Sequence, residues 1–422
     1  MKVFKFGGAS VKDANAVKNV AKVLGGYAND NLLVVISAMG KTTNLLEKLL
    51  DAYFNKTDDK QSTFDDVKEF HNNIINELLP QTQSHAFDEI ENIFIELECL
   101  LEAEPEHSYD YHYDQIVSYG EMLSTKILST YLNEAGLKNR WMDAQNFIST
   151  DNNYREGKVN WTLTNEKIAK TLRPIVLKKM VITQGFIGRS NENTTVTLGR
   201  EGSDYSAAIF AFCLDAESIT IWKDVAGVMN ADPKQFAEAV KISGLSYNKA
   251  IEMAYYGATV IHPKTIQPLL NKEIPLFVKS FVNPDDEGTI VGVSKEKEDK
   301  ISTYIFKQNQ MLISIASKDF SFIVEENLSS IFSLFAKYGV KINVMQNSAI
   351  SFTVCVDYKE NKCNDLIIDL EQNYKVKTNN DLVLLTISNY ETAQINQFTE
   401  NKKILMEQRN RRSLQLVLAQ QS

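Results

Sequence analysis

The stretch Thr197-Leu-Gly-Arg-Glu-Gly-Ser-Asp204 is the part of this chain that says most about its fold. It follows an apolar run expected to form a strand, residues 181–186, and leads directly into an apolar run expected to form a helix, residues 205–214. A strand, a turn and a helix in this order present backbone amides, an arginine and a carboxylate at one helix N-terminus, where the helix dipole favours an anion. We therefore predict an anion-binding site at this turn.

The amino terminus carries a second element of this kind, Lys2-Val-Phe-Lys-Phe-Gly-Gly-Ala-Ser10. It is a short β run that contains Lys5 and ends in two glycines and a serine. Glycines after a strand allow close approach of the backbone to a ligand, and consecutive amides can form a concave anion nest beside which an ammonium neutralises charge. Two separate anion-binding elements indicate phosphate chemistry.

Length and charge exclude several classes of protein. A chain of 422 residues favours two or three domains. Its net charge of −9 argues against nonspecific binding to nucleic acid or to an anionic membrane, because phosphate groups would be repelled over most of the surface. The basic cluster Arg409, Arg411 and Arg412 is interpreted as a solvated helix end.

Cysteine usage and hydropathy indicate an ordinary cytoplasmic protein. The four cysteines show no CxxC pair and no zinc-ligand spacing, which favours a reducing compartment. No apolar segment is long enough to span a membrane, and Met1 leads into a strand rather than a signal peptide. We expect a cytoplasmic protein without a dedicated metal site.

Strand and helix signals alternate over most of the chain, which predicts an α/β fold with a mostly parallel central sheet between helices. The expected strands are residues 32–37, 181–183, 218–222 and 274–278, and the expected helices are 43–53, 116–135, 203–214 and 247–256. Residues 64–102 interrupt the alternation with a purely helical pattern. We interpret them as an inserted helical subdomain, either a cover for the core or a lid.

A turn at residues 283–288 and a charged run at 295–300 precede a region with a different pattern. Its signals follow the order βαββαβ: strand 311–316, helix 327–338, strands 340–345 and 350–356, helix 364–373, and a tail from 381 that supplies further elements. This predicts an α+β, ferredoxin-like region after the α/β domain.

Taken together, these stretches resemble the aspartate kinase (aspartokinase) family of the amino-acid kinase superfamily. The further matching stretches, in the order of the family, are Ser37-Ala-Met-Gly-Lys-Thr-Thr-Asn44, Ser118-Tyr-Gly-Glu121, Ile221-Trp-Lys-Asp-Val-Ala-Gly-Val-Met-Asn-Ala-Asp-Pro233 and Tyr256-Gly-Ala-Thr-Val-Ile-His-Pro-Lys264. The resemblance implies an amino-acid kinase domain at residues 1–290, a linker at 291–300, an ACT-like domain at 301–390 and a second, abridged ACT-like unit at 391–422. It also implies a monofunctional enzyme, since no dinucleotide-binding segment follows the ACT-like region.

The resemblance implies transfer of the γ-phosphoryl group of ATP, with its Mg²⁺, to the side-chain carboxylate of L-aspartate. This is the first step towards lysine, threonine and methionine. The implied catalytic residues are Lys5, Gly8 and Asp204, and the implied substrate-binding residues are Ser37, Thr43, Glu121, Arg200, Gly202 and Ser203. The implied ATP-binding residues are Lys5, Gly7, Gly8, Ser10, Lys223, Asp224, Met229, Asp232, Lys234 and Thr259.

Regulation is implied by the ACT-like region. In the family, ACT units pair between subunits and bind lysine or threonine, so we expect a homodimer with feedback inhibition. Asn343, Gln346 and Asn347, in an exposed strand and loop, are the expected effector contacts.

Three positions depart from the family pattern. Ala9 stands where threonine is usual, Glu201 where a small residue is usual, and Thr259 where some relatives have a lysine that contacts ATP. These departures concern the phosphate loop, the turn at Arg200 and the ATP contacts, respectively.

Alternative interpretations remain at this stage. One is a kinase for another amino-acid carboxylate, and another is a non-catalytic amino-acid sensor that binds through the ACT-like region. Asp204 can also be read as a helix cap rather than as a catalytic group. A Walker A loop is rejected, because Val35 stands where that motif requires its first glycine before Gly40-Lys-Thr42.

Overall fold

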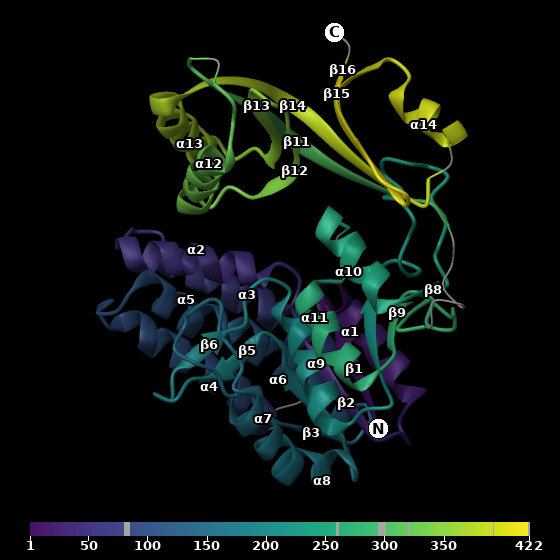
Figure 1. Cartoon of the computed structure of the whole chain (residues 1–422). Helices are drawn as coiled ribbons and strands as arrows, with labels where there is room; N and C mark the ends of the chain where they lie inside the picture. The colour runs from purple at the N-terminus through teal and green to yellow at the C-terminus, as the bar shows by residue number, and fades with distance from the viewer. Residues whose placement is uncertain (80–84, 259–260, 294–300, 320, 391, 421–422) are drawn as a thin grey trace. The chain divides into compact units, whose positions relative to one another are not determined.

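The computed structural model describes residues 1–79, 85–258, 261–293, 301–319, 321–390 and 392–420 (Figure 1). The chain forms two compact units. The first unit comprises Met1–Val228, Ser243–Ile251 and Val260–Glu298, and the second comprises Met229–Ile242, Glu252–Thr259 and Asp299–Ser422.

The first unit is built on an eight-stranded sheet that is parallel except for its β9–β10 pair. In their order across the sheet, the strands are β3 (Asn139–Trp141), β4 (Met180–Gln184), β2 (Leu32–Ile36), β1 (Lys2–Phe6), β7 (Ser218–Lys223), β9 (Leu276–Ser280), β10 (Thr289–Val291) and β8 (Gly244–Leu245). Strand β1 lies inside the sheet, so that Lys5 is paired with Val35 of β2 and Ile221 of β7. The predicted α/β class with a mostly parallel sheet is confirmed.

Helices cover both faces of this sheet. The helices of this part of the chain are α1 (Ala14–Gly25), α2 (Thr42–Asn55), α3 (Lys60–Leu78), α4 (His85–Glu102), α5 (Tyr109–Val117), α6 (Tyr119–Glu134), α7 (Trp161–Lys167), α8 (Arg173–Val176), α9 (Gly202–Leu214), α10 (Tyr247–Tyr256) and α11 (Pro263–Lys272). On one face of the sheet α9 packs against β1, β2 and β7, and on the other α6 packs against β2 and β4. Every residue of β2 is buried, as expected for a strand of a parallel sheet that is covered on both sides.

Side chains alternate across β1, which decides what each face receives. Phe4 and Phe6 join the apolar cluster formed with α1, α2 and α6. Lys5 points to the other face, where it reaches Asp204 of α9. Because side chains alternate between the two faces of a strand, Lys5 points away from Phe4 and Phe6 and towards α9, which carries its partner Asp204.

The helical insert contributes to the same core. Phe64 and Val67 of α3 and Phe94 and Leu97 of α4 are buried in the cluster that includes α2 and α6. The insert therefore covers part of the core, and a lid role for residues 64–102 stays a hypothesis.

A short hairpin precedes α9. Strands β5 (Ile187–Arg189) and β6 (Thr195–Thr197) pair antiparallel between β4 and the turn that contains Arg200. These two strands were not predicted, because three residues are too few to show an alternating pattern. The hairpin fixes where the turn begins.

The second unit contains a six-stranded antiparallel sheet with helices packed on it. Its elements are β11 (Thr303–Ser317), α12 (Glu325–Tyr338), β12 (Ile342–Asn347), β13 (Ser351–Asp357), α13 (Glu360–Asn373), β14 (Tyr374–Ser388), α14 (Thr392–Thr399), β15 (Lys402–Arg409) and β16 (Ser413–Gln420). Ile331 and Phe335 of α12 and Leu366 of α13 are buried against β11 and β13. The predicted βαββαβ order is confirmed from β11 to β14.

One prediction about the tail is wrong. Arg409 ends strand β15, and Arg411 and Arg412 lie in the turn that leads into β16, so the cluster is the end of a hairpin and not of a helix. Strand β15 was missed because Lys402–Arg409 alternates only weakly between apolar and polar residues.

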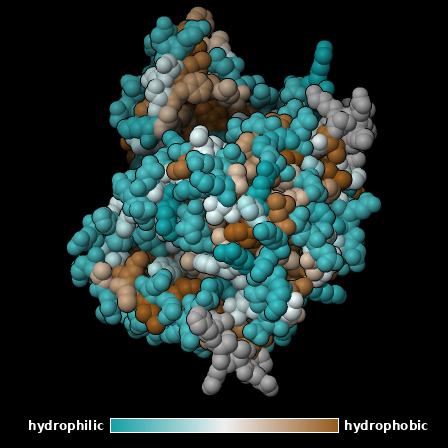
Figure 2. Space-filling model, turned by 90° about the horizontal axis from the view of Figure 1, so that it is seen from below, coloured by the Kyte–Doolittle hydropathy of each residue, from teal (hydrophilic) through white to brown (hydrophobic). Residues whose placement is uncertain are grey.

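One face of the molecule is mostly hydrophilic (Figure 2), as we expect for a chain in which 23% of the residues are charged. On the face that Figure 2 shows, hydrophilic side chains predominate and hydrophobic ones form small separate areas. Among the described residues, the search for a helix with the length and hydropathy needed to cross a bilayer finds none.

Candidate active site

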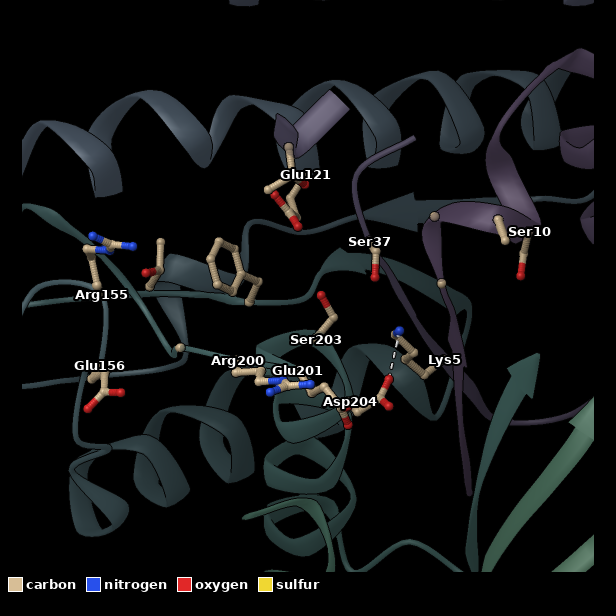
Figure 3. A pocket seen from close by; sticks show the side chains of 18 of the residues that line it. Lys5, Ser10, Ser37, Glu121, Arg155, Glu156, Arg200, Glu201, Ser203 and Asp204 are labelled. Atoms are coloured by element: carbon tan, nitrogen blue, oxygen red, sulfur yellow. Dashed lines mark ion pairs between the residues drawn. The ribbon is translucent and has the colours of Figure 1, made fainter. Parts of the chain in front are cut away.

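A cavity of about 930 Å³ opens in the first unit at the carboxyl ends of its central strands. This is where an open α/β sheet is expected to bind ligands. Its wall contains Lys5 and the glycines after β1, Ser37 after β2, Lys223 at the end of β7, and the turn that leads into α9 (Figure 3). Stretches far apart in the sequence, including both predicted anion-binding elements, therefore meet in one cavity.

Lys5 and Asp204 form a buried ion pair in this cavity. Lys5 Nζ lies 2.7 Å from Asp204 Oδ1, and the two side chains are only 10% and 5% exposed. Asp204 lies in the first turn of α9, whose N-cap is Glu201 with a left-handed φ of 53°. Asp204 is therefore not the N-cap of this helix, and its carboxylate is directed at Lys5 instead.

The loop after β1 can be built only with glycine at position 8. A Cβ on Gly8 would lie 2.8 Å from the carbonyl oxygen of Ala38 and 2.9 Å from that of Gly40. Gly40 N also donates a hydrogen bond of 3.1 Å to Gly8 O. The loops after β1 and β2 are thus in backbone contact at the cavity wall.

The Ser10 hydroxyl oxygen is buried in the short helix that follows Gly7, and it has no hydrogen-bond partner among the described residues. A buried hydroxyl without a partner is unusual in a folded protein, and here it lines a cavity. It is available to a ligand that brings its own hydrogen-bonding groups.

Glu121 is a buried carboxylate on α6. It is 3% exposed, its Oε1 accepts a hydrogen bond of 3.4 Å from Ala38 N, and its Oε2 has no partner among the described residues. Burial raises the pKa of Glu121 to about 8. In Figure 3 it projects towards the side of the cavity that carries Arg200 and Ser203.

Arg200 lies opposite this carboxylate on the turn before α9. Arg200 is exposed, and it lines the cavity together with Gly202, Ser203, Ser37 and Thr43. A Cβ on Gly202 would lie 2.7 Å from the Phe186 ring, so this position also requires glycine. A guanidinium, a carboxylate and several small polar groups around one space can bind both charged ends of an amino acid.

Only some of the predicted nucleotide contacts line the cavity. Lys223 and Asp224, at the end of β7, line the cavity. Met229, Asp232 and Lys234 belong to the second unit and are not among the residues that line it. Thr259 lies outside the described residues.

The predicted effector residues lie on β12 in the second unit. Asn343 takes part in a polar network: its Nδ2 donates to Gln310 Oε1 at 2.8 Å and to Asp357 Oδ1 at 2.9 Å, and its Oδ1 accepts from Lys307 Nζ at 2.9 Å. Gln346 and Asn347 are exposed at the end of the strand.

Sequence reasoning missed one wall of the cavity. Asp110 and Tyr113 of α5 line it together with the loop Asn153, Tyr154, Arg155 and Glu156. No role was predicted for the polar run Asp151-Asn-Asn-Tyr-Arg-Glu-Gly157, because nothing in it pointed to the same space as Arg200. The helix predicted at residues 116–135 corresponds to α6, and α5 was not predicted.

No group of three or more metal-ligating side chains occurs among the described residues. The carboxylates of Asp204 and Asp224 nevertheless line the cavity. A divalent ion that arrives bound to a nucleotide would therefore find oxygen ligands nearby, which are the ligands that Mg²⁺ prefers.

Known proteins are similar to this chain in both sequence and fold. The model of the amino acid kinase family matches residues 1–280. The lysine-sensitive aspartokinase 3 of Escherichia coli is 31% identical over 355 residues, which cover 84% of this chain and 78% of that protein.

Two crystal structures of E. coli aspartokinase III superpose on the chain. One, with aspartate and ADP in the R-state, has 27% identity and a TM-score of 0.83, and covers 99% of this chain and 96% of that one. The other, with lysine and aspartate in the T-state, has 28% identity and a TM-score of 0.84, and covers 99% and 95%. On these matches, this chain belongs to the amino acid kinase family and, within it, to the aspartokinases.

Proposed function

We propose that this protein transfers the γ-phosphoryl group of ATP to the side-chain carboxylate of L-aspartate, giving 4-phospho-L-aspartate. The observation that carries the proposal is the composition of one cavity. A buried Lys5–Asp204 pair beside a glycine loop lies in the same space as Arg200 and Glu121, which suit the two charged ends of an amino acid. The product is the first intermediate on the route to lysine, threonine and methionine.

The amino-acid end of the site consists of Arg200, Glu121 and small polar groups. Arg200 binds the α-carboxylate in a bidentate manner, and Glu121 binds the α-ammonium. Ser37, Thr43, Ser203 and the Gly202 amide position the side chain of the substrate. The reacting carboxylate has an ordinary pKa near 3.9 and is ionised at neutral pH, so it needs no general base.

Phosphoryl transfer then depends on position and charge. The Lys5 ammonium lies against the transferring group, and the amides of Gly7 and Gly8 with the Ser10 hydroxyl bind its oxygens. Asp204 orients Lys5 from 2.7 Å. Charge stabilisation by preorganised donors is the main source of catalysis in phosphoryl transfer.

The nucleotide binds at the side of Lys223 and Asp224, with Met229, Asp232, Lys234 and Thr259 as further contacts. ATP would bring Mg²⁺ as part of the substrate, and the ion would neutralise phosphate charge, with the carboxylates of Asp204 and Asp224 in the cavity wall available to it.

Regulation is assigned to the second unit. The E. coli relative was crystallised with lysine in its T-state, and we propose lysine as the effector here, with threonine as the alternative. Asn343, Gln346 and Asn347 contact the effector in a homodimer formed through the ACT-like region. The proposed boundaries are a catalytic domain at 1–290, a linker at 291–300, an ACT-like domain at 301–390 and a second, abridged unit at 391–422.

The test is formation of aspartyl hydroxamate from Mg-ATP, L-aspartate and hydroxylamine, which traps an acyl phosphate. We expect product from the wild type, and a loss of about a hundredfold or more in Lys5→Ala. The matched control is Lys2→Ala on the same strand, whose ammonium pairs with Asp30 outside the cavity and whose loss leaves activity unchanged. Product from glutamate but not from aspartate would contradict the assigned substrate, and no product from either would contradict the reaction class.

A further inference from the structure

The helix α5 carries a carboxylate that the proposed reaction does not use. Asp114 is fully buried, with an exposed fraction of 0%. It accepts three hydrogen bonds: from Thr197 Oγ1 at 2.6 Å, from Thr197 N at 2.9 Å and from Arg155 N at 2.9 Å. A fully buried aspartate is rare unless its acceptor groups are satisfied, and here every donor comes from a segment that lines the cavity.

The first of these segments leads to Arg200. Thr197 is the last residue of β6, and Arg200 follows in the next turn of chain. The neighbouring Gln115 reinforces this contact, because its side chain donates to Thr195 O at 2.9 Å and accepts from Thr195 N at 3.2 Å. Strand β6 is thus attached to α5 at both ends.

The second segment is the loop that contains Arg155. Its φ of 66° lies in the left-handed region, which a non-glycine residue adopts only when its surroundings hold it there. Three contacts do so: Asp114 accepts its N–H, Asp110 pairs with Nη1 at 3.1 Å, and the Tyr113 ring lies 4.3 Å from its guanidinium. All three partners are on α5.

The two segments also touch each other. Gly199, with a φ of 80°, leaves room for the Arg155 carbonyl oxygen, which would be only 3.2 Å from a Cβ at that position. Helix α6, which carries Glu121, begins directly after α5. The position of Arg200 relative to Glu121 is therefore set through α5.

We propose that Asp114 is a positioning residue for amino-acid binding: its buried carboxylate fixes the Arg155 loop and the Arg200 turn to α5, which sets the distance between Arg200 and Glu121. The inference rests on the proposed function, since it assigns these two side chains to the α-carboxylate and the α-ammonium of the substrate. Asp114 itself touches neither substrate, and it is not among the residues that line the cavity.

The hydrogen bonds that Asp114 accepts are strongest when its carboxylate is ionised. An ionised aspartate accepts hydrogen bonds at both oxygens, whereas an asparagine of nearly the same shape has a single acceptor oxygen and an NH₂ group. Oδ2 accepts both backbone N–H groups and Oδ1 accepts the Thr197 hydroxyl. In Asp114→Asn the amide oxygen can take the place of Oδ2, but all three bonds lose the contribution of the negative charge, and the NH₂ group faces Thr197 Oγ1, whose hydroxyl must turn from donor to acceptor. Burial raises the pKa of Asp114 to about 6, so the group is still mostly ionised at neutral pH.

The experiment compares steady-state constants of the full chain by the hydroxamate assay. For Asp114→Asn we expect the KM for aspartate to rise by about threefold to tenfold, because the bonds that hold both segments to α5 are weakened. The KM for ATP and the kcat at saturation should stay within about threefold, because Lys5, Gly8 and Asp204 are held by other elements. Thr197→Val, which removes only the 2.6 Å bond, should give a smaller rise in the KM for aspartate, and Thr197→Ser, which keeps the hydroxyl, should restore it.

The matched control is Asp143→Asn. Asp143 is also a largely buried carboxylate that accepts a backbone hydrogen bond, from Gln145 N at 3.0 Å, but it does not line the cavity or contact β6. We expect its KM for aspartate to stay within about twofold of the wild type. Thermal unfolding of each variant separates loss of positioning from loss of folding.

Three outcomes would overturn the inference. One is an aspartate KM within about twofold of the wild type in folded Asp114→Asn, and another is an equal rise in the KM for both substrates. If Asp114→Asn does not fold, the third applies: equal aspartate KM values for Thr197→Val and Thr197→Ser. Failure of the wild type to form any hydroxamate would instead refute the proposed function, and the inference with it.

Discussion

Glu121 gives the sharpest test of how the amino-acid substrate is bound. If Glu121 pairs with the α-ammonium, only its ionised form binds aspartate well. Because burial raises its pKa to about 8, the carboxyl is mostly protonated in the free enzyme at neutral pH. Aspartate binding should therefore strengthen as the pH rises.

The size of this effect follows from the fraction of enzyme that is competent to bind. With a pKa of about 8, the apparent KM for aspartate exceeds its limiting value about 11-fold at pH 7 and about twofold at pH 8. The KM should thus fall about fivefold between pH 7 and pH 8. The ionised fraction increases with pH, so the sign is a decrease in KM, and kcat at saturation should change little.

The assay is hydroxamate formation at varied aspartate and saturating Mg-ATP, from pH 6.5 to 8.5. Glu121→Gln should have a higher KM for aspartate and should lose the pH dependence of that constant. Glu134→Gln, an exposed change at the end of the same helix, should retain it. An aspartate KM that is independent of pH in the wild type, or a dependence that survives in Glu121→Gln, would refute the reasoning.

Three further predictions concern the loop, the ion pair and the insert. Gly8→Ala should abolish most activity, because the new Cβ would lie 2.8 Å from the Ala38 carbonyl oxygen, whereas Gly25→Ala, with nothing within 4 Å, should leave the hydroxamate rate unchanged; equal rates would contradict this account. Asp204→Asn should lower kcat about a hundredfold or more through loss of the partner of a catalytic lysine, and a kcat above half that of the wild type would be inconsistent with that role. The buried His71 has a pKa lowered to about 4, so between pH 6.5 and pH 4 the unfolded chain takes up a proton that the folded chain does not. The contribution of His71 to stability should fall over that window by on the order of 3 kcal/mol, so the free energy of unfolding of the wild type in urea should fall by that amount relative to that of His71→Leu, and an unchanged difference between the two would contradict this.

The class of fold and the two anion-binding stretches, Lys2–Ser10 and Thr197–Asp204, could be predicted from the sequence. The strand–turn–helix pattern that contains Asp204 and the β run that contains Lys5 each predicted an anion-binding element, and the resemblance to the family implied that the two residues are catalytic. Such patterns are local, and the parallel sheet then brings the carboxyl ends of its strands to one edge. The structure places both side chains in one cavity, as this reasoning required.

The α5 wall of the cavity could not be predicted in this way. Asp114, Tyr113 and Arg155 are ordinary residues of a helix and a loop, and their role exists only because α5 packs against β6. The strands of that hairpin are three residues long, so neither they nor their partners left a periodic signal. Contacts between elements that are distant in sequence are decided by tertiary packing, which a pattern along the chain does not encode.

The central place of β1 in the sheet has a consequence for how activity is acquired. Lys5 lies on a strand whose neighbours are β2 on one side and β7, residues 218–223, on the other, while its ionic partner stands on α9. The reactive centre therefore cannot form until β1 has met segments that lie about 200 residues further along the chain. Pairings of such high contact order form slowly during folding. After denaturation, activity should consequently return later than the circular dichroism of the helices. Enzymatic activity would then report the late pairing of distant segments and not the early collapse of the chain.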